Sequence, residues 1–268
     1  MSPAPHIVGV VNLTEDSFSD GGLFVEPAAA IAHARELLRD GADVVELGPA
    51  SSHPDARAVA PEQEIRRLEP LLEPLCGSGV AISVDSFQPE TQRFALGRGV
   101  AFLNDVRGFP HAELYPELAR SAARLVVMHS AAAAGRARRE RRDPEAALRS
   151  IEAFFDKRVG QLVAAGVARE RLVLDPGMGF FLASNPEPSV AALRALPRLR
   201  QRFGLPLLVS VSRKSFLGEL AGREIADRGA ATLAAELFAA ARGVDFIRTH
   251  DVRALRDALE VWRALDVR

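Results

Sequence analysis

The stretch VAISVDSFQPETQRFALGRGVAFLND (80–105) contains the unit from which the fold of the whole chain is predicted. Two continuous apolar runs, 80–85 and 100–105, enclose a helical pattern at 89–99 that begins with a proline. Continuous apolar runs are typical of parallel strands buried on both faces, and proline in a first turn is typical of a helix start. The stretch therefore predicts a strand, a crossover helix and a second, parallel strand.

The same unit repeats along the chain. Strands are predicted at 6–13, 42–47, 80–85, 100–105, 124–129, 171–176, 205–212 and 244–250. Helices are predicted at 27–41, 61–75, 89–99, 111–122, 144–166, 186–204, 229–243 and 252–265. Eight such pairs in 268 residues, with no linker-like gap, favour one (β/α)₈ barrel domain over 1–268. An open doubly wound sheet is the alternative, although no GxGxxG sequence follows the first strand to support it.

Composition limits the class of partner. The formal net charge is -1 and 48% of the residues are hydrophobic, which argues against nucleic acid or an anionic membrane surface and for small-molecule substrates. The chain starts without the basic and apolar regions of a signal peptide, and its apolar runs fall short of the ~20 residues that span a bilayer. The lone Cys76 cannot form an internal disulfide. We expect a cytoplasmic protein.

The predicted strands end in polar residues, which is where barrel active sites form. In chain order these residues are Asn12, Glu46, Ser51, Ser52, Asp85, Asn104, Asp105, His129, Asp175, Ser212, Arg213, Lys214, Arg248 and His250. A barrel does not need such groups for stability, and unpartnered buried charges are costly. Lysine is scarce, since only Lys157 and Lys214 occur, so Lys214 is a candidate for a role that arginine cannot fill.

These side chains predict a site for an amphoteric, flat substrate. We expect the carboxylates Asp85, Asp105 and Asp175 to face the cations Arg213, Lys214 and Arg248. Carboxylates accept hydrogen bonds from one edge of an aminopyrimidine-type ring, while Lys or Asn donates to another, and Met128, Phe180 and Phe181 can contact its faces. Structural alternatives remain: Asp85 as an ion-pair partner, Asp175 as a turn brace, Arg213 and Lys214 as a solvated pair, and His129 as a packing residue.

Metal and nucleophile motifs are absent from the sequence: there is no Cys/His cluster, Walker loop or serine nucleophile elbow. The one metal considered is magnesium, bridging Asn12 and a substrate phosphate. Magnesium fits because it takes few protein ligands and keeps waters and phosphate oxygens.

Eight collinear motifs resemble the signatures of dihydropteroate synthases. They are GVVNLTEDSFSDGG (9–22), GADVVELGPASSHPDA (41–56), ISVDSFQPE (82–90), FLNDVRG (102–108), VVMHS (126–130), LVLDPGMGF (172–180), VSVSRKSFLG (209–218) and IRTHD (247–251). The resemblance implies a (β/α)₈ transferase of folate biosynthesis that joins a pterin pyrophosphate to p-aminobenzoate, and a homodimer formed through the last helices.

The resemblance also implies roles for individual residues. Asp85, Asn104, Asp175 and Lys214 would hold the pterin, with Met128 and Phe180 at its faces, and Asn12 would bind magnesium. Arg248 and His250 would form an anion site, with Asp85, Asp175, Lys214 and Arg248 carrying the chemistry. Thr14, Asp16 and Phe18 would close over the pyrophosphate. Ser52, Pro54, Phe180 and Ser212 would lie around the p-aminobenzoate site, and Ser51, Phe181 and Arg213 are further candidates for substrate binding.

Departures from the family pattern lie near the p-aminobenzoate site. Glu15 replaces the usual proline, GGESTRPG becomes GPASSHPD (48–55), and GFGK becomes GFFL (179–182). These changes resemble the Sul-type, sulfonamide-insensitive synthases, and a bulky Phe181 is predicted to exclude the drug. The alternatives are a sulfonamide-sensitive synthase, a pterin-binding methyltransferase-type barrel and a catalytically inactive pterin-binding protein.

Overall fold

In a computed structural model of the chain, the structure describes residues 4–14, 26–51, 56–131 and 140–265. The strands are β1 (His6–Asn12), β2 (Val44–Gly48), β3 (Ile82–Asp85), β4 (Phe102–Asp105), β5 (Arg124–Met128), β6 (Leu172–Asp175), β7 (Leu208–Val209) and β8 (Phe246–Thr249). The α-helices are α1 (Pro27–Arg39), α2 (Pro61–Cys76), α3 (Pro89–Gly97), α4 (Tyr115–Arg120), α5 (Pro144–Ala164), α6 (Glu187–Phe203), α7 (Ser215–Ala221), α8 (Gly229–Ala241) and α9 (Val252–Leu265). Short 3₁₀ helices lie at Ala112–Leu114, Arg169–Arg171, Gly179–Phe181 and Ile225–Asp227.

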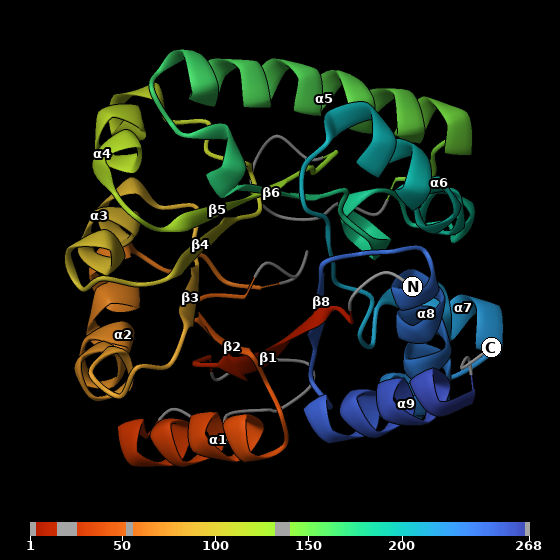
Figure 1. The fold of residues 1–268 in the computed structure, drawn as a ribbon, viewed down its shortest axis with the longest axis horizontal. Helices are drawn as coiled ribbons and strands as arrows, with labels where there is room; N and C mark the ends of the chain where they lie inside the picture. The colour runs from red at the N-terminus through yellow and green to blue at the C-terminus, as the bar shows by residue number, and fades with distance from the viewer. Residues whose placement is uncertain (1–3, 15–25, 52–55, 132–139, 266–268) are drawn as a thin grey trace.

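The strands form a barrel surrounded by helices. All pairings are parallel, in the order β6-β5-β4-β3-β2-β1-β8-β7, and a parallel bridge between Leu174 and Leu207 joins the two end strands. Figure 1 looks down this barrel and shows the helices as an outer ring around the strands. The predicted (β/α)₈ barrel is confirmed, and the open doubly wound sheet is wrong.

Local sequence explains where the helices begin and end. Pro27, Pro61, Pro89 and Pro144 each occupy a first turn, where the missing N–H would have no intrahelical acceptor. The side chain of Asp143 caps α5 by accepting a hydrogen bond from the backbone N–H of Ala146 at 2.8 Å.

Two elements differ from the prediction. β7 covers only Leu208–Val209 of the predicted 205–212, and the preceding Pro206 cannot donate to a neighbouring strand. The helix α7 was not predicted, because its seven residues are too few to show a clear helical repeat. It begins directly after Lys214, so it fixes the direction in which the chain leaves that residue.

Alternate strand residues point into the barrel, where they form stacked layers. One layer is an apolar cluster from seven strands: Val8, Val44, Phe102, Val126, Val173, Leu208 and Phe246. Two residues further along five of these strands, the inward positions are Glu46, Asn104, Met128, Asp175 and Arg248. The apolar layer therefore fills the barrel beneath a layer rich in polar groups.

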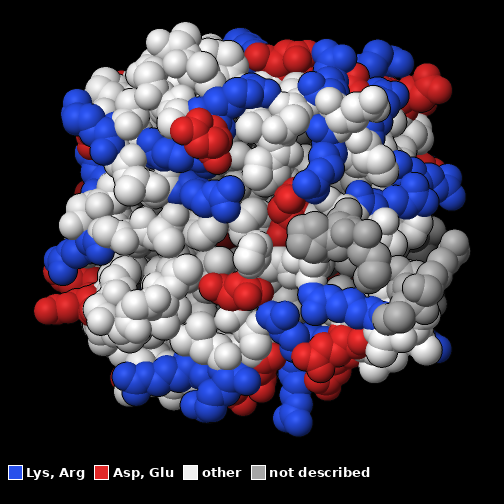
Figure 2. Space-filling model, viewed as in Figure 1, with Lys and Arg blue, Asp and Glu red and all other residues white. Residues whose placement is uncertain are grey.

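The outer surface carries charges of both signs. On the face in Figure 2, Lys and Arg side chains are interspersed with Asp and Glu side chains, so this face has no single-sign patch. Within the described part of the chain, no helix is long and apolar enough to cross a membrane.

Candidate active site

The buried carboxylate Glu46 connects the polar layer across the barrel. Glu46 is 1% exposed, and its Oε2 accepts hydrogen bonds from Ser83 Oγ at 2.9 Å and Asn104 Nδ2 at 3.2 Å. Its Oε1 accepts a hydrogen bond from Arg248 Nε, and Arg248 Nη2 lies 3.7 Å from Asp85 Oδ2. Side chains from β2, β3, β4 and β8 are thereby held in one network.

Asp175 and Lys214 form the opposite side of this layer. Asp175 ends β6, and its Oδ1 accepts a hydrogen bond from the backbone N–H of Gly177 at 2.8 Å. Lys214 precedes α7, and its ammonium lies 4.8 Å from the ring centroid of Phe181. A cation over an aromatic face is attracted by the ring quadrupole, so Phe181 helps to place Lys214.

Burial shifts the pKa of three groups in this layer, Asp85, Asp175 and Lys214. It raises the pKa of Asp85 to about 8, with a further rise from Glu46, while Arg248 opposes the shift. It raises the pKa of Asp175 to about 6, against the Gly177 N–H and the charge of Lys214. Burial and Arg248 lower the pKa of Lys214 to about 8, which the two aspartates oppose. The layer therefore holds groups that can change charge near neutral pH when a ligand binds.

An apolar wall adjoins the charged groups. Met128, Phe181 and Val106 pack together, with Phe87 and Phe180 against them. Flat apolar surfaces beside hydrogen-bonding groups suit an aromatic ring that is polar at its edges.

His250 and Ser212 form a second buried pair. His250 Nδ1 lies 2.9 Å from Ser212 Oγ, and burial, followed by the charges of Arg248, Arg213 and Lys214, lowers the pKa of His250 well below its usual range. The imidazole is therefore neutral at physiological pH. Arg213 has a φ of 57°, and its backbone N–H donates to Thr232 Oγ1 at 3.0 Å, which fixes the turn that carries Lys214.

Residues after β1 and β2 border a small cavity of about 250 Å³. It is lined by Thr14, Ser51, Ala56, Arg57, Ala58, Val59, Gln63 and Arg67. The buried hydroxyl of Thr14 has no hydrogen-bond partner among the described residues. Asn12 ends β1 beside Gly48, where an added Cβ would lie 3.4 Å from Asn12 Oδ1.

The structure does not place every predicted residue in this layer. Asp16, Phe18, Ser52 and Pro54 are outside the described residues. Asp105 does not face the cations as expected: it accepts hydrogen bonds from Gln92 Nε2 at 2.9 Å and from the backbone N–H of Arg107 at 2.7 Å. It directly follows the inward-facing Asn104, so the strand pleat turns it outward toward α3.

His129 also points away from the polar layer. Its Nδ1 lies 3.2 Å from the carbonyl oxygen of Pro176, and its Nε2 lies 3.1 Å from Ser150 Oγ. Burial lowers the pKa of His129 to about 4. His129 is therefore a packing residue between β5 and α5.

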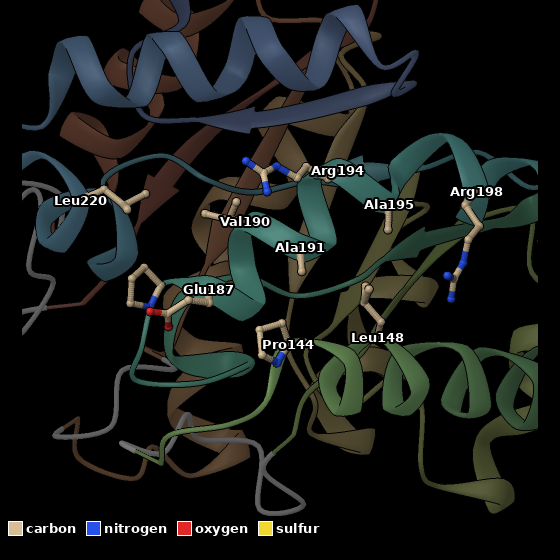
Figure 3. Close-up of a pocket in the computed structure, with 10 residues that line it drawn as sticks. Pro144, Leu148, Glu187, Val190, Ala191, Arg194, Ala195, Arg198 and Leu220 are labelled. Carbon is tan, nitrogen blue, oxygen red and sulfur yellow. The ribbon is translucent and has the colours of Figure 1, made fainter.

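A larger groove lies among the helices. Figure 3 shows this groove, of about 650 Å³, between residues of α5, α6 and α7 that include Leu148, Val190 and Leu220. The described residues that line the groove belong to helices or lie directly before one, not at the strand ends. They include no cluster of carboxylates. The candidate active site is therefore the polar layer at the strand ends.

Comparison with known proteins identifies the family. The model of the pterin binding enzyme family matches residues 8–250. Dihydropteroate synthase type-2 from Escherichia coli is 58% identical over 259 residues, which cover 97% of this chain and 95% of the relative. The chain belongs to the dihydropteroate synthase family. It is therefore a transferase, built on the same barrel as its relatives.

Solved structures of dihydropteroate synthase from Xanthomonas albilineans agree. One, with 4-aminobenzoic acid, has a TM-score of 0.88 and 37% identity, and covers 99% of this chain and 94% of that one. Another, in complex with 7,8-dihydropteroate, has a TM-score of 0.85 and 36% identity, and covers 99% and 95% respectively. The likeness extends over nearly the whole of each synthase.

Glu46 is the member of the polar network that the predicted substrate site omits. It lies near the end of an apolar run, and no residue close to it in the sequence is an evident ion-pair or hydrogen-bond partner for its carboxylate. The two-residue period from Val44 could have placed it inside the barrel, but the contact with Arg248 joins residues 202 positions apart.

Proposed function

We propose that this chain catalyses the condensation of 6-hydroxymethyl-7,8-dihydropterin pyrophosphate with p-aminobenzoate to give 7,8-dihydropteroate and pyrophosphate. The observation that carries this proposal is the layer of Asp85, Asn104, Asp175 and Lys214 above the apolar barrel filling of a dihydropteroate synthase, with Asn104 and Asp175 buried and Asp85 and Lys214 half-buried. Residues 1–268 would form one pterin-binding domain.

The buried layer would recognise the pterin by its edges. Asp175 and Asp85 would accept hydrogen bonds from ring N–H groups, and Lys214 would donate to the ring ketone and ring nitrogen. Asn104 would form a further hydrogen bond to the edge of the pterin ring, while Met128 and the ring of Phe180 would contact the faces of the pterin. N–H donors favour ionised carboxylates, which offsets the burial that raises the pKa of both aspartates.

The chemistry breaks one bond and forms another. The C–O bond between the pterin methylene and pyrophosphate breaks, and the leaving group keeps the electron pair. The p-aminobenzoate nitrogen then forms the C–N bond and loses a proton to solvent. Asp85 and Asp175 stabilise the positive charge that develops on the ring, and Arg248 offsets the charge of the leaving group. Since an arylamine is already a nucleophile, most of the catalysis is positioning.

Magnesium would fit the end of β1. Asn12 supplies an amide oxygen, and the buried Thr14 hydroxyl, which lacks a partner among the described residues, lies two residues further on. No group of three or more His, Cys, Asp or Glu side chains suited to a metal occurs in the described ranges, so the protein would contribute few ligands. Bound magnesium would offset pyrophosphate charge.

The remaining substrate contacts are assigned by resemblance. Thr14, Asp16 and Phe18 would close over the pyrophosphate, and Arg248 with His250 would bind anionic oxygens. Ser52, Pro54, Phe180 and Ser212 would surround p-aminobenzoate, with Ser51, Phe181 and Arg213 as further substrate-binding residues. The neutral state of His250 makes it a hydrogen-bonding partner for an anion rather than a second cation.

We propose further that the enzyme excludes sulfonamides through Phe181. The ring of Phe181 packs on Met128 and lies over Lys214, so it borders the pterin layer where p-aminobenzoate must approach. A sulfonamide mimics p-aminobenzoate but is bulkier beyond its ring, so the side chain can reject the drug and spare the substrate.

The variants Phe181→Gly and Phe180→Gly test this exclusion. The wild type should have a sulfonamide inhibition constant well above its KM for p-aminobenzoate. F181G should lower the ratio of the two constants by about tenfold or more, as expected for the loss of a steric clash, and F180G should change it less. F181G also removes the ring that contacts Lys214, so it can lower the overall activity. The ratio of the two constants for one variant corrects for that loss. A wild type inhibited at concentrations near its KM for p-aminobenzoate would contradict the proposal.

Titration with p-aminobenzoate separates a synthase from an inactive binding protein. With pterin pyrophosphate present, a synthase releases pyrophosphate until the limiting substrate is consumed. A binding protein would show saturable binding with no release. A methyltransferase-type barrel would bind the pterin without any dependence on p-aminobenzoate.

We propose also that the protein is a homodimer and that it is cytoplasmic. The helices α8 and α9 border an apolar groove of about 530 Å³, with Trp262 46% and Leu265 82% exposed. Apolar surface of this kind suits a second copy of the chain, in line with the family resemblance. Light scattering should give a mass of two chains, and Trp262→Glu should shift it toward one.

A further inference from the structure

We infer that Glu46 is a positioning residue that sets which atoms of Arg248 and Asn104 face the pterin pyrophosphate. This inference rests on the proposed function, and it concerns a side chain that the assigned pterin contacts do not include. Glu46 lies inside the barrel between the apolar layer and Asp85, and it contacts three other strands.

The first part of the inference concerns Arg248. A guanidinium is planar, so a contact at Nε fixes the direction of the whole fork. Glu46 Oε1 accepts a hydrogen bond from Arg248 Nε. The terminal nitrogens of Arg248 then point toward Asp85, and Nη2 lies 3.7 Å from Asp85 Oδ2. The side chain of Arg248 is 15% exposed, and without Glu46 its charge would be left with the carboxylates of Asp85 and Asp175 and, within the described structure, no hydrogen bond to either.

The second part concerns the amide of Asn104. Its Nδ2 donates to Glu46 Oε2 at 3.2 Å, so its Oδ1 points the other way. That Oδ1 is buried and has no hydrogen-bond partner among the described residues. An unsatisfied buried acceptor is costly unless a ligand or water supplies a donor. Glu46 therefore makes Asn104 an acceptor toward the ligand, which selects a ring edge that carries an N–H at this point.

Replacing the carboxylate with an amide breaks this arrangement. Both oxygens of Glu46 accept hydrogen bonds, whereas the amide of a Glu46→Gln variant accepts through its oxygen alone. The oxygen of the new amide can therefore accept from Arg248 or from the present donor of Asn104, but not from both. If its nitrogen faces Asn104, the Asn104 amide must rotate, and it then presents donors instead of an acceptor to the pterin.

We predict that adding Asn104→Asp to E46Q restores part of the pterin binding that E46Q loses. In the double variant E46Q/N104D, the new amide can donate to the new carboxylate at position 104, whose second oxygen again faces the ligand as an acceptor. N104D alone places two carboxylates side by side, which disfavours one ionised form. The two changes should therefore be non-additive, as expected for residues in direct contact.

The experiment measures calorimetric pterin binding and steady-state kinetics for wild type, E46Q, N104D and E46Q/N104D. E46Q should weaken pterin binding about tenfold and raise the KM for pterin pyrophosphate similarly, while the KM for p-aminobenzoate stays within about twofold. The double variant should bind pterin more tightly than the product of the two single losses predicts.

Asp245→Asn is the matched control at the other end of β8. Asp245 Oδ2 pairs with Arg200 Nη1 at 2.9 Å and accepts from the Leu207 N–H at 2.8 Å, so D245N also weakens a carboxylate–arginine pair. It should lower the unfolding temperature with pterin affinity unchanged. E46Q affinity equal to wild type, or strictly additive losses in the double variant, would overturn the inference. A wild type that binds no pterin would instead overturn the proposed function.

Discussion

Asp85, Asp175 and Lys214 share one layer at the strand ends, and partial or full burial moves the pKa of each toward neutrality. A pair of carboxylates beside a cation can be held in this way only if each charge is compensated by the others or by a ligand. The pterin would supply N–H donors for the carboxylates and acceptors for Lys214. Binding of the pterin should therefore depend on pH and on the lysine charge.

The pH dependence follows from the two aspartates. The pKa of Asp85 is raised to about 8 and that of Asp175 to about 6, so protons compete with the ring N–H donors first at Asp85 and, below pH 6, at Asp175 as well. We expect kcat/KM for pterin pyrophosphate to fall below about pH 8, and its slope to steepen by about a further tenfold per pH unit below about pH 6. Asp175→Asn should remove the steeper part along with most of the activity. A wild-type profile whose slope does not increase below pH 6 would contradict the role of Asp175.

Lys214 offers a sharp comparison because the chain has one other lysine. Lys214→Met should lower kcat/KM for pterin pyrophosphate about 100-fold, the loss expected for one hydrogen bond to a charged group. Lys157→Met changes an exposed residue of α5 and should leave the activity as it is. Equal activity of the two variants would show that Lys214 does not contact the substrate.

At the scale of elements, the turn after β6 places the Asp175 carboxylate. Gly177 has a φ of 74°, and an added Cβ would lie 2.3 Å from the carbonyl oxygen of His129. Only glycine fits such a position, because both the dihedral angle and the space exclude a side chain. The same turn directs the Gly177 N–H onto Asp175 Oδ1 at 2.8 Å.

Gly177→Ala should therefore affect stability and binding together. We expect it to lower the free energy of unfolding by more than about 2 kcal/mol and to weaken pterin binding. Gly204→Ala is the matched control, since Gly204 has a φ of 58° but no atom within 4 Å of an added Cβ. It should cost about 1 kcal/mol from the dihedral angle alone, with binding unchanged. Denaturant unfolding and calorimetry measure both effects, and equal destabilisation by the two variants would contradict the role of the close contact.

Most elements were predictable from local sequence, whereas α7 and the extent of β7 were not. Apolar runs and first-turn prolines located the helices α1, α2, α3 and α5 because these features act locally. α7 and the two-residue β7 depend on tertiary contacts, such as the Asp245 side chain that accepts from the Leu207 N–H. Such long-range pairings leave little trace in local sequence.

At the scale of the whole molecule, barrel closure brings distant strand ends together. The sequence identified Asp85, Asn104, Asp175, Lys214 and Arg248 as strand-end residues, and the barrel places them in one layer. It did not distinguish inward from outward positions, because the pleat register is set by the pairing of neighbouring strands. For that reason Asp105 was expected in the layer, while Glu46 was given no role.

Pyrophosphate release by the wild type tests the central claim most directly. Pterin pyrophosphate, p-aminobenzoate and magnesium are mixed with the enzyme, and the assay is repeated without p-aminobenzoate and with a sulfonamide present. We predict that pyrophosphate and 7,8-dihydropteroate form in equal amounts, only with both substrates, and that the drug leaves the rate nearly unchanged. Absence of dihydropteroate with both substrates present would contradict the assignment of this chain as a synthase, and abolition of the rate by the drug would leave a sulfonamide-sensitive one.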